Sequence, residues 1–242
     1  MRSPDRVQGK GHSRKAGAST PEPQREIRRA TIQAIHAISA VAGRRDAYTA
    51  LHQRRVASLA RVIGERLKVT QHCLDGLYLG GLVHDIGKIA IPAELLVKPG
   101  RLTAEEYALI KTHVPAGCEI LEYLVLPWPI RAMIEQHHER LDGSGYPNGL
   151  VGEAISLEAR IIAVADVFEA MSSHRPYRAA PGKEAALAEL QGRAGTAFDS
   201  RVVAAVTAVV VEHANLGDLW TVLESDPTTT STAILPRLPS GT

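Results

Sequence analysis

The sequence has few cysteines: Cys73 and Cys118 are the only two among 242 residues, and they share no CxxC spacing. Their scarcity excludes a disulfide scaffold and a zinc site built from thiolates, and it favours a reduced cytoplasmic protein. Long apolar runs are missing too, since no stretch approaches the roughly 18 residues of a membrane span. The N-terminus lacks the apolar core of a signal peptide. We therefore expect neither membrane insertion nor secretion.

A strong excess of charge is also missing, because the formal net charge is only +2. Residues 1–30 carry eight basic and three acidic side chains, a local charge of +5 that leaves −3 for the remaining 212 residues. Nucleic-acid-binding domains normally carry a basic surface within the fold, so this distribution argues against a nucleic-acid polymer as partner. The histidines of the acidic part are more informative.

Composition divides the chain into an arm, a folded body and a tail. Residues 1–25 contain Gly, Ser, Pro and basic residues but hardly any large apolar side chains, which predicts a disordered basic arm. The chain is long enough for one domain with a sizeable core, which we place at residues 26–217. The segment 218–242 is rich in Thr, Ser and Pro and is predicted to be a partly disordered tail.

Helical periodicity recurs along the body, whereas the alternation typical of strands is nearly absent, so we predict an all-α fold. Helices are expected at residues 27–43, 46–67, 70–84, 103–113, 115–124, 129–139, 157–172, 183–193 and 200–214. Asp46 and Thr70 are predicted N-caps, and Thr103 with Glu106 forms a predicted capping box. Residues 142–149 are dense in turn formers and should form a tight, exposed loop.

Five histidines and two aspartates occupy the ends or apolar faces of these predicted helices: His52, His84, His113, His137, His138, Asp85 and Asp166. Asp166 lies within the apolar run 161–168, and a carboxylate buried there requires a partner or a metal ion. Mixed imidazole and carboxylate ligands suit Fe, Mn, Zn or Ni better than Ca. Seven ligands exceed the needs of one ion, whereas two ions that share a bridging carboxylate would use them all.

Two motifs in the chain match the signatures of a known family. Residues 84–88, HDIGK, match the HDxGK signature of HD-domain phosphohydrolases, and residues 137–147, HHERLDGSGYP, match the HHExxDGxGYP signature of HD-GYP proteins. From about residue 30 to 215 the chain resembles the HD-GYP family. The resemblance implies a five-helix HD core with additional C-terminal helices. It also implies metal-dependent hydrolysis of the bacterial second messenger cyclic di-GMP to pGpG or GMP.

The same resemblance implies how the seven ligands divide between two ions, with Asp85 as the bridge. The first ion would be held by His52, His84, Asp85 and Asp166, and the second by Asp85, His113, His137 and His138. Fe or Mn is the expected metal, with Zn, Ni or Mg as alternatives. Some relatives carry a glutamate four residues before the first histidine, which supports a third ion. Tyr48 stands at that position in this chain, so we expect two ions.

Catalytic and substrate-binding roles are expected for further residues of these motifs. Asp85 and Lys88 are the catalytic candidates, Lys88 as a contact to a phosphate oxygen or the leaving group; the alternative is a solvated lysine that caps a helix. Arg175 and Arg178 carry planar guanidinium groups that suit phosphate or guanine. The turn residues of the second motif are expected to shape the substrate pocket: Gly145, Tyr146 and Pro147.

The remaining candidate residues receive structural interpretations. Phe168 and Met171 are expected in the core, and Glu169 at the rim of the pocket or on the surface. The histidines outside the predicted ligand set are interpreted as structural or surface residues: His36, His72, His174 and His213.

Two other functions stay open at this point. The substrate could be another cyclic dinucleotide such as cyclic GMP-AMP, or the chain could be a non-catalytic signalling module that binds cyclic di-GMP or a diguanylate cyclase. A homodimer is a further candidate assembly. Only about 25 residues precede the first predicted helix, too few for a sensory domain, which favours a standalone enzyme or regulation by oligomerisation or expression.

Overall fold

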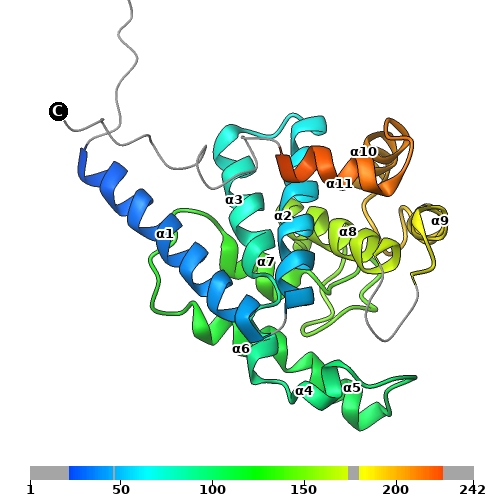
Figure 1. Ribbon diagram of the computed structural model, residues 1–242, viewed down its shortest axis with the longest axis horizontal. Helices are drawn as coiled ribbons and strands as arrows, with labels where there is room; N and C mark the ends of the chain where they lie inside the picture. Colours follow the sequence, from blue (N-terminus) through cyan, green and yellow to red (C-terminus); the bar gives the residue numbers. More distant parts are fainter. Residues whose placement is uncertain (1–21, 46, 174–179, 226–242) are drawn as a thin grey trace, which may run out of the picture.

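The computed structural model describes residues 22–45, 47–173 and 180–225 (Figure 1). In these ranges every regular element is a helix, which confirms the predicted all-α fold. The α-helices are α1 (Glu22–Arg45), α2 (Ala47–Arg66), α3 (Gln71–Val83), α4 (Ala93–Leu96), α5 (Ala104–Lys111), α6 (His113–Ile120), α7 (Ile130–Gln136), α8 (Leu157–Ser172), α9 (Lys183–Gly192), α10 (Ser200–Val211) and α11 (Leu216–Ser225). Two 3-10 helices, η1 (Ile86–Ala90) and η2 (Gly152–Ala154), complete the set.

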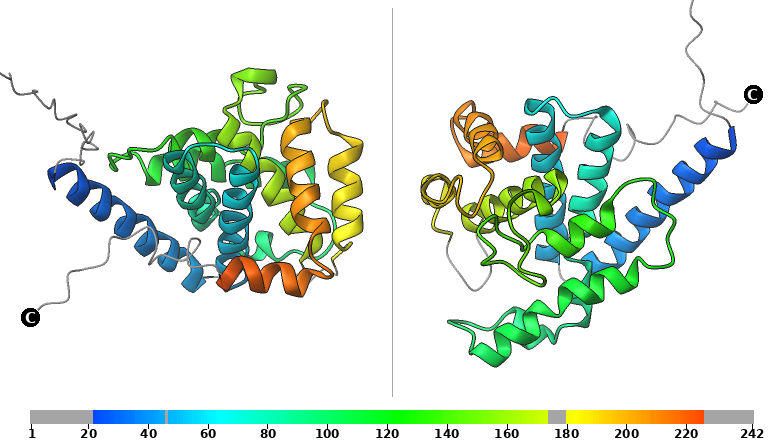
Figure 2. Two further views of the ribbon diagram at one scale, coloured as in Figure 1. Left: turned by 90° about the horizontal axis from the view of Figure 1, so that it is seen from above. Right: turned by 180° about the vertical axis from the view of Figure 1, so that it is seen from behind.

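The antiparallel helices α2 and α3 form the centre of the molecule. A Cβ added at Gly81 of α3 would lie 2.5 Å from the Cα of Ala57, so the glycine allows the two helices to approach closely. In Figure 1, α1 lies on one side of this pair, and α9 and α10 lie on the other. Figure 2 shows α9 and α10 side by side, and α4 with α5 extending from the body of the molecule.

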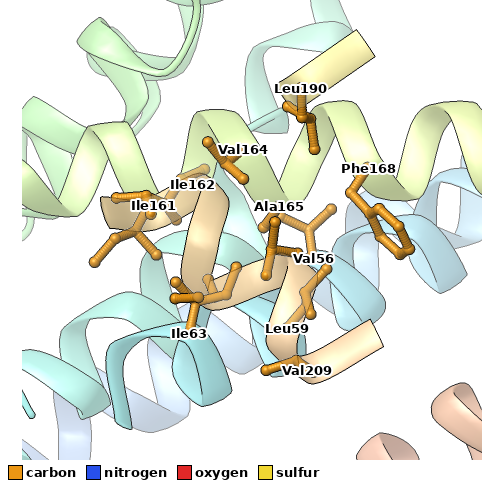
Figure 3. Packing of buried hydrophobic residues seen from close by; sticks show 14 of the residues in the cluster. Val56, Leu59, Ile63, Ile161, Ile162, Val164, Ala165, Phe168, Leu190 and Val209 are labelled. Atoms are coloured by element: carbon orange, nitrogen blue, oxygen red, sulfur yellow. The ribbon is translucent and has the colours of Figure 1, made fainter. Parts of the chain in front are cut away.

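Two groups of buried apolar side chains hold the helices together. The larger group joins α2 to α8, α9, α10 and α11, and Figure 3 shows Val56, Leu59 and Ile63 of α2 packed with Ala165 and Phe168 of α8. The smaller group joins α1, α3, α6 and α7. Burial of apolar area in both groups is the main stabilising contribution to this fold.

Predicted capping residues define the starts of two helices. The Thr70 hydroxyl accepts a hydrogen bond from the Cys73 amide at 3.3 Å, and α3 follows directly. In the predicted capping box, Glu106 N–H donates to Thr103 Oγ1 at 3.2 Å and Thr103 N–H donates to Glu106 Oε2 at 2.9 Å. Both predictions are confirmed. Asp46 lies outside the described residues.

The helical region is longer at both ends than predicted. Helix α1 begins at Glu22 rather than Ile27, and the boundary predicted at residue 217 falls inside α11. Leu219, Trp220 and Leu223 of α11 are buried, so the folded domain extends to Ser225 and the predicted start of the tail is wrong. The short elements η1, α4 and η2 were not predicted, because three to five residues carry no periodic signal.

Within the described ranges, no single helix combines the length and hydropathy of a membrane span. Among the described helices, α10 and α11 taken together meet that criterion, and they are bent by 101° at the break between them.

Candidate metal centre

All seven predicted ligands converge on one place in the structure. His52 comes from the second turn of α2 and Asp166 from α8, while the other five lie at or just beyond helix ends: His84, Asp85, His113, His137 and His138. The side chain of Asp166 is 15% exposed, and most of the others are fully buried. Side chains from five segments thus meet between the central helices.

The carboxylate of Asp85 divides the cluster into two halves. Its Oδ2 lies 3.4 Å from Nε2 of His84 and 3.7 Å from Nε2 of His52. Its Oδ1 lies 3.4 Å from Nε2 of His113 and 3.8 Å from Nε2 of His137. Each oxygen therefore faces a different pair of imidazoles, which is the arrangement of a carboxylate that bridges two ions.

The remaining ligands extend the two halves in the predicted way. Oδ1 of Asp166 lies 3.2 Å from Nε2 of His52 and belongs to the first half. Ligand atoms of His113, His137 and His138 lie within 4.8 Å of one another and of Asp85, and they form the second half. Both groups have a size and composition that can hold a metal ion.

Unpaired polar atoms in the centre fit bound metal ions. Nε2 of His84, Nε2 of His113, Nε2 of His137 and Oδ1 of Asp85 are buried without a hydrogen-bond partner. Burial of such atoms is costly unless something pairs with them, and divalent cations would pair with all four. The donor set therefore fits the group that the sequence predicts.

Backbone carbonyls orient three of these rings. Nδ1 of His84 lies 2.8 Å from the carbonyl of Gly81, and His113 and His137 make the same contact to Ile110 and Ile134 at 2.7 Å. A carbonyl can only accept, so Nδ1 carries the hydrogen and the lone pair of Nε2 faces the centre. Such contacts fix the tautomer that binds a metal.

The protonation states also suit metal binding. Burial lowers the pKa of His113 to about 4 and lowers those of His137 and His138 as well. Burial alone would raise the pKa values of Asp85 and Asp166. Lys88, His84 and His137 nevertheless hold the pKa of Asp85 well below its ordinary value, and His52 and His84 do the same for Asp166. The carboxylates are therefore ionised, and these three imidazoles are neutral.

His52 differs because two carboxylates surround it. Burial alone would lower its pKa, but hydrogen bonds with Asp166 and Glu169 raise it to about 9. Without metal, His52 is protonated at neutral pH. Metal binding at this position must release that proton.

Glu169 does not lie where the sequence analysis placed it. It is 1% exposed rather than at the rim or surface, and its Oε2 is hydrogen-bonded to Nδ1 of His52. Glu169 follows Asp166 by three residues on α8, so both side chains face His52 from one side of the helix. The three-residue spacing from Asp166 was the feature of the sequence that could have predicted the contact of Glu169 with His52.

Lys88 lies at the edge of the centre. Its Nζ forms an ion pair with Oδ2 of Asp85, and its side chain is 27% exposed. It belongs to η1 rather than to a continuing α-helix. A Cβ added at Gly87 would lie 1.8 Å from the carbonyl oxygen of His113, so glycine at this motif position lets η1 pack on α6.

The loop of the second motif covers the His138 side of the centre. The ring of Tyr146 stacks on His138 with centroids 4.7 Å apart, and Tyr107 meets Tyr146 edge-on. A Cβ at Gly145 would lie 2.4 Å from the Cα of Glu139, so only glycine fits there. The buried carboxylate of Glu139 anchors the loop, accepting from the amides of Asn148 and Leu150 at 2.7 and 3.0 Å.

Only some of the predicted substrate-binding residues lie within the part of the chain that the structure describes. Pro147 follows Tyr146 through a cis peptide bond and is exposed. Arg175 and Arg178, the predicted contacts for phosphate or guanine, lie outside the described residues, as does His174. The core position of Phe168 is confirmed, whereas Met171 is only partly buried and packs against the edge of the core.

A cavity of about 170 Å³ opens next to Asp85 and Lys88. Its walls come from the end of α1, the start of α2, η1 and α4. The lining is largely apolar: Ala42, Ile86, Ile89, Ala93, Leu96 and Val97, with Thr49 as a further polar member. An apolar recess thus adjoins the charged centre.

Comparison with known proteins identifies the family of this fold and site. The sequence-family model of the HD domain matches residues 36–202 of this chain. This chain belongs to the HD-domain family. With the two motifs described above, it is an HD-GYP member of that family.

Two curated relatives are similar to this HD-GYP chain. The cyclic di-GMP phosphodiesterase response regulator RpfG of Xanthomonas campestris is 45% identical over 67% of this chain and 43% of its own length. The 3'3'-cGAMP-specific phosphodiesterase 1 of Vibrio cholerae is 41% identical over 66% of this chain and 37% of its own. The chain thus spans less than half of the length of these relatives.

A solved structure supports the fold. The HD-GYP-type protein Bd1817 of Bdellovibrio bacteriovorus aligns with a TM-score of 0.58 and 18% identity, covering 78% of this chain and 69% of that protein. At this identity the likeness concerns the HD fold alone.

Proposed function

We propose that this chain is a metal-dependent phosphodiesterase that hydrolyses cyclic di-GMP to pGpG or GMP. The observation that carries the proposal is the division of the ligand cluster by Asp85, whose two oxygens face separate imidazole pairs. Two divalent ions held by these residues would lower the pKa of a bound water and compensate charge on the phosphoryl oxygens. The named activity of RpfG supports the substrate.

The proposed ligand sets follow the two halves of the cluster. The first ion takes His52, His84, Asp85 and Asp166, and the second takes Asp85, His113, His137 and His138. Mixed imidazole and carboxylate donors support Fe or Mn as the bound metal. Zn, Ni and Mg are the alternative metals. Tyr48 in place of glutamate supports two ions rather than three.

The chain's own side chains would bind and orient the dinucleotide. Lys88, at the mouth of the centre, would contact a phosphate oxygen once its pairing with Asp85 is released. Tyr146 would shield the centre from water on the His138 side. Arg175 and Arg178 are proposed as further phosphate or guanine contacts.

The apolar cavity beside Lys88 would hold one nucleobase. A closed apolar cavity of about 150 Å³ in another protein binds benzene, and the cavity here has a volume of about 170 Å³. Filling it with Ala93→Leu should raise KM for the cyclic dinucleotide. The same variant should change kcat much less than KM, because Ala93 is not among the proposed metal ligands.

A second candidate substrate is cyclic GMP-AMP. The observation that favours it is the 41% identity to a phosphodiesterase named as specific for 3'3'-cGAMP. A non-catalytic signalling role is less well supported, because a module that only binds would not need the complete ligand set. A homodimer and a diguanylate cyclase partner remain predictions, as does the cytoplasmic location inferred from the scarcity of cysteine.

Hydrolysis assays on purified protein test the proposal. Protein purified without oxygen and loaded with Fe or Mn should convert cyclic di-GMP to pGpG or GMP, identified by mass spectrometry. Asp85→Ala protein should not. Faster turnover of cyclic GMP-AMP would reassign the substrate, and binding of both dinucleotides without hydrolysis over hours would contradict the enzymatic role.

A further inference from the structure

His52 differs from the other buried ligands in how its ring is held. The rings of His84, His113 and His137 are oriented by the carbonyl three residues earlier in the chain. Nδ1 of His52 instead bonds to the carboxylate of Glu169, which is 117 positions away in the sequence. A side chain can be repositioned by its neighbours more easily than a carbonyl in a helical turn. The orientation of His52 therefore depends on tertiary contacts.

Arg55 is the cation that faces Glu169. It lies three residues after His52 on α2, and its NH1 is 3.9 Å from Oε1 of Glu169. The same nitrogen donates to the hydroxyl of Ser173 at 3.4 Å, just beyond the end of α8. Burial alone would raise the pKa of Glu169, but His52, Ser173 and Arg55 together lower it. Glu169 thus hydrogen-bonds to the His52 imidazole through Oε2, while its buried Oε1 faces the Arg55 guanidinium as an ion pair without a hydrogen bond.

Helix α11 holds the far side of Arg55. Nε of Arg55 donates to Oε1 of Glu224 at 3.0 Å, and its guanidinium carbon lies 5.0 Å from the ring centroid of Trp220. Trp220 is 5% exposed, and its ring lies 6.2 Å from that of Phe168, the residue before Glu169. Helix α11 therefore contacts both Arg55 and the part of α8 that carries Glu169.

The second half of the metal centre is built differently. Its rings belong to the ends of short helices, where carbonyls orient His113 and His137, and Tyr146 stacks on His138. Helix α11 is placed to act on the His52 half. Displacement of α11 should accordingly weaken binding of the ion on the His52 side more than binding of the other ion.

We propose that Glu169 and Arg55 are positioning residues for the ion on the His52 side, and that α11 sets the affinity of this ion through Trp220 and Glu224. The inference rests on the two-ion centre proposed above, and it is independent of the identity of the substrate. A ligand or domain that displaces α11 would weaken one ion selectively and so regulate the centre from the C-terminal end of the domain. The coupled residues are defined here as the α11 relay: His52, Glu169, Arg55, Trp220 and Glu224.

Titration of metal-free protein with Mn²⁺ tests the relay one ion at a time. His113→Ala protein should retain the His52-side ion, and Asp166→Asn protein should retain the other ion, so each background reports on one half. Glu169→Gln or Arg55→Met in the first background should weaken Mn²⁺ binding by about 10- to 100-fold, as removal of an outer-shell partner does elsewhere. In the second background the same changes should leave the affinity within about twofold. Arg55→Lys, which keeps the charge, should recover most of the loss.

Glu224→Gln tests the link to α11 without touching the metal centre, because Glu224 lies on the surface with its side chain 44% exposed. It should weaken Mn²⁺ binding several-fold in the His113→Ala background. The matched control is Glu212→Gln, which breaks another pair between α2 and the C-terminal region, Arg66 with Glu212, and should change neither affinity.

Three results would overturn the proposal. The first is unchanged Mn²⁺ affinity in Arg55→Met protein of the His113→Ala background. The second is equal weakening in both backgrounds, which would indicate general damage to the fold. The third is a Glu224→Gln protein that binds like its parent, which would separate α11 from the metal centre. Because Glu224→Gln alters only an exposed pair, this arm stays informative if the Arg55 variants do not fold.

Discussion

At the scale of single residues, the histidines of the metal-free centre differ in charge: His52 is protonated at neutral pH, whereas His113 is neutral. The pKa of His52 is raised from 6.5 to about 9 in the folded protein, so its stabilising contribution is complete below pH 6.5 and is lost as the pH rises to about 9. The pKa of His113 is lowered to about 4, so the unfolded chain binds the additional proton between pH 6.5 and 4. Acid therefore destabilises the folded state over that range.

These two shifts predict a stability maximum for the metal-free protein near neutral pH. Urea unfolding in the presence of a chelator should give a free energy of unfolding that falls on both sides of this maximum. His52→Gln should flatten the alkaline side alone. A constant free energy of unfolding between pH 7 and 9 in the unmodified protein would contradict the role assigned to His52.

Lys88 gives a second prediction at this scale. Lys88→Met removes a cation that pairs with Asp85, so Mn²⁺ binding should be retained or strengthened. Hydrolysis should nevertheless fall by a factor on the order of 10² in kcat, the usual loss when a charge-stabilising donor is removed. Metal titration and steady-state kinetics on one preparation separate the two effects. Loss of metal binding in this variant would instead indicate a structural role.

At the scale of elements, the packing of η1 on α6 brings Asp85 to His113. Gly87→Ala places a methyl group 1.8 Å from the His113 carbonyl, so one of the two elements must shift. We expect a loss of about 1–3 kcal/mol in the free energy of unfolding, typical of overpacking, and weaker binding of the second ion. Gly192→Ala, where an added Cβ meets nothing within 4 Å, is the matched control and should be close to neutral. Equal stabilities of the two variants, measured by urea unfolding, would exclude a strict need for glycine at position 87.

The elements also show how far sequence reasoning reaches. Long amphipathic helices and side-chain caps such as Thr70 and Thr103 could be predicted, because their signals are local. The convergence of the ligands could be expected only from the two motifs, since no local pattern places His52 beside Asp166. Glu169 was misplaced because its burial depends on the packing of α8 against α2.

Helix α11 was missed for a related reason. Its apolar residues follow Gly217 and precede a Thr- and Ser-rich stretch, so composition suggested a tail. The N-cap was nevertheless present in the sequence, because Asn215 Oδ1 accepts from the amide of Asp218 at 2.9 Å. Its burial against α2 is a long-range contact that composition does not encode.

At the scale of the whole molecule, α11 closes the larger apolar core. Truncation after residue 217 removes the buried side chains of Leu219, Trp220 and Leu223. It should cost at least about 3 kcal/mol of the free energy of unfolding, the cost of truncating one buried tryptophan. Truncation after Ser225 should cost less than about 0.5 kcal/mol, because the removed segment is the part predicted from composition as a tail. Similar unfolding midpoints for the two truncated proteins would contradict the extended domain boundary.

The whole molecule also has a charge balance that depends on its metals. The formal charge of residues 31–242 is −3, and two divalent cations would make this part positive overall. A positive centre beside an apolar cavity suits an anionic dinucleotide. The proposed binuclear centre would therefore supply the positive charge of this part of the chain.

The number of metal ions bound per chain tests that centre most directly. Elemental analysis of protein purified without oxygen, combined with Mn²⁺ titration of the metal-free form, should give two ions per chain in the unmodified protein. Asp166→Asn should retain one ion, and Asp85→Ala, which removes the bridge, should retain none with comparable affinity. A single ion in the unmodified protein, or two in Asp85→Ala, would contradict a centre bridged by Asp85.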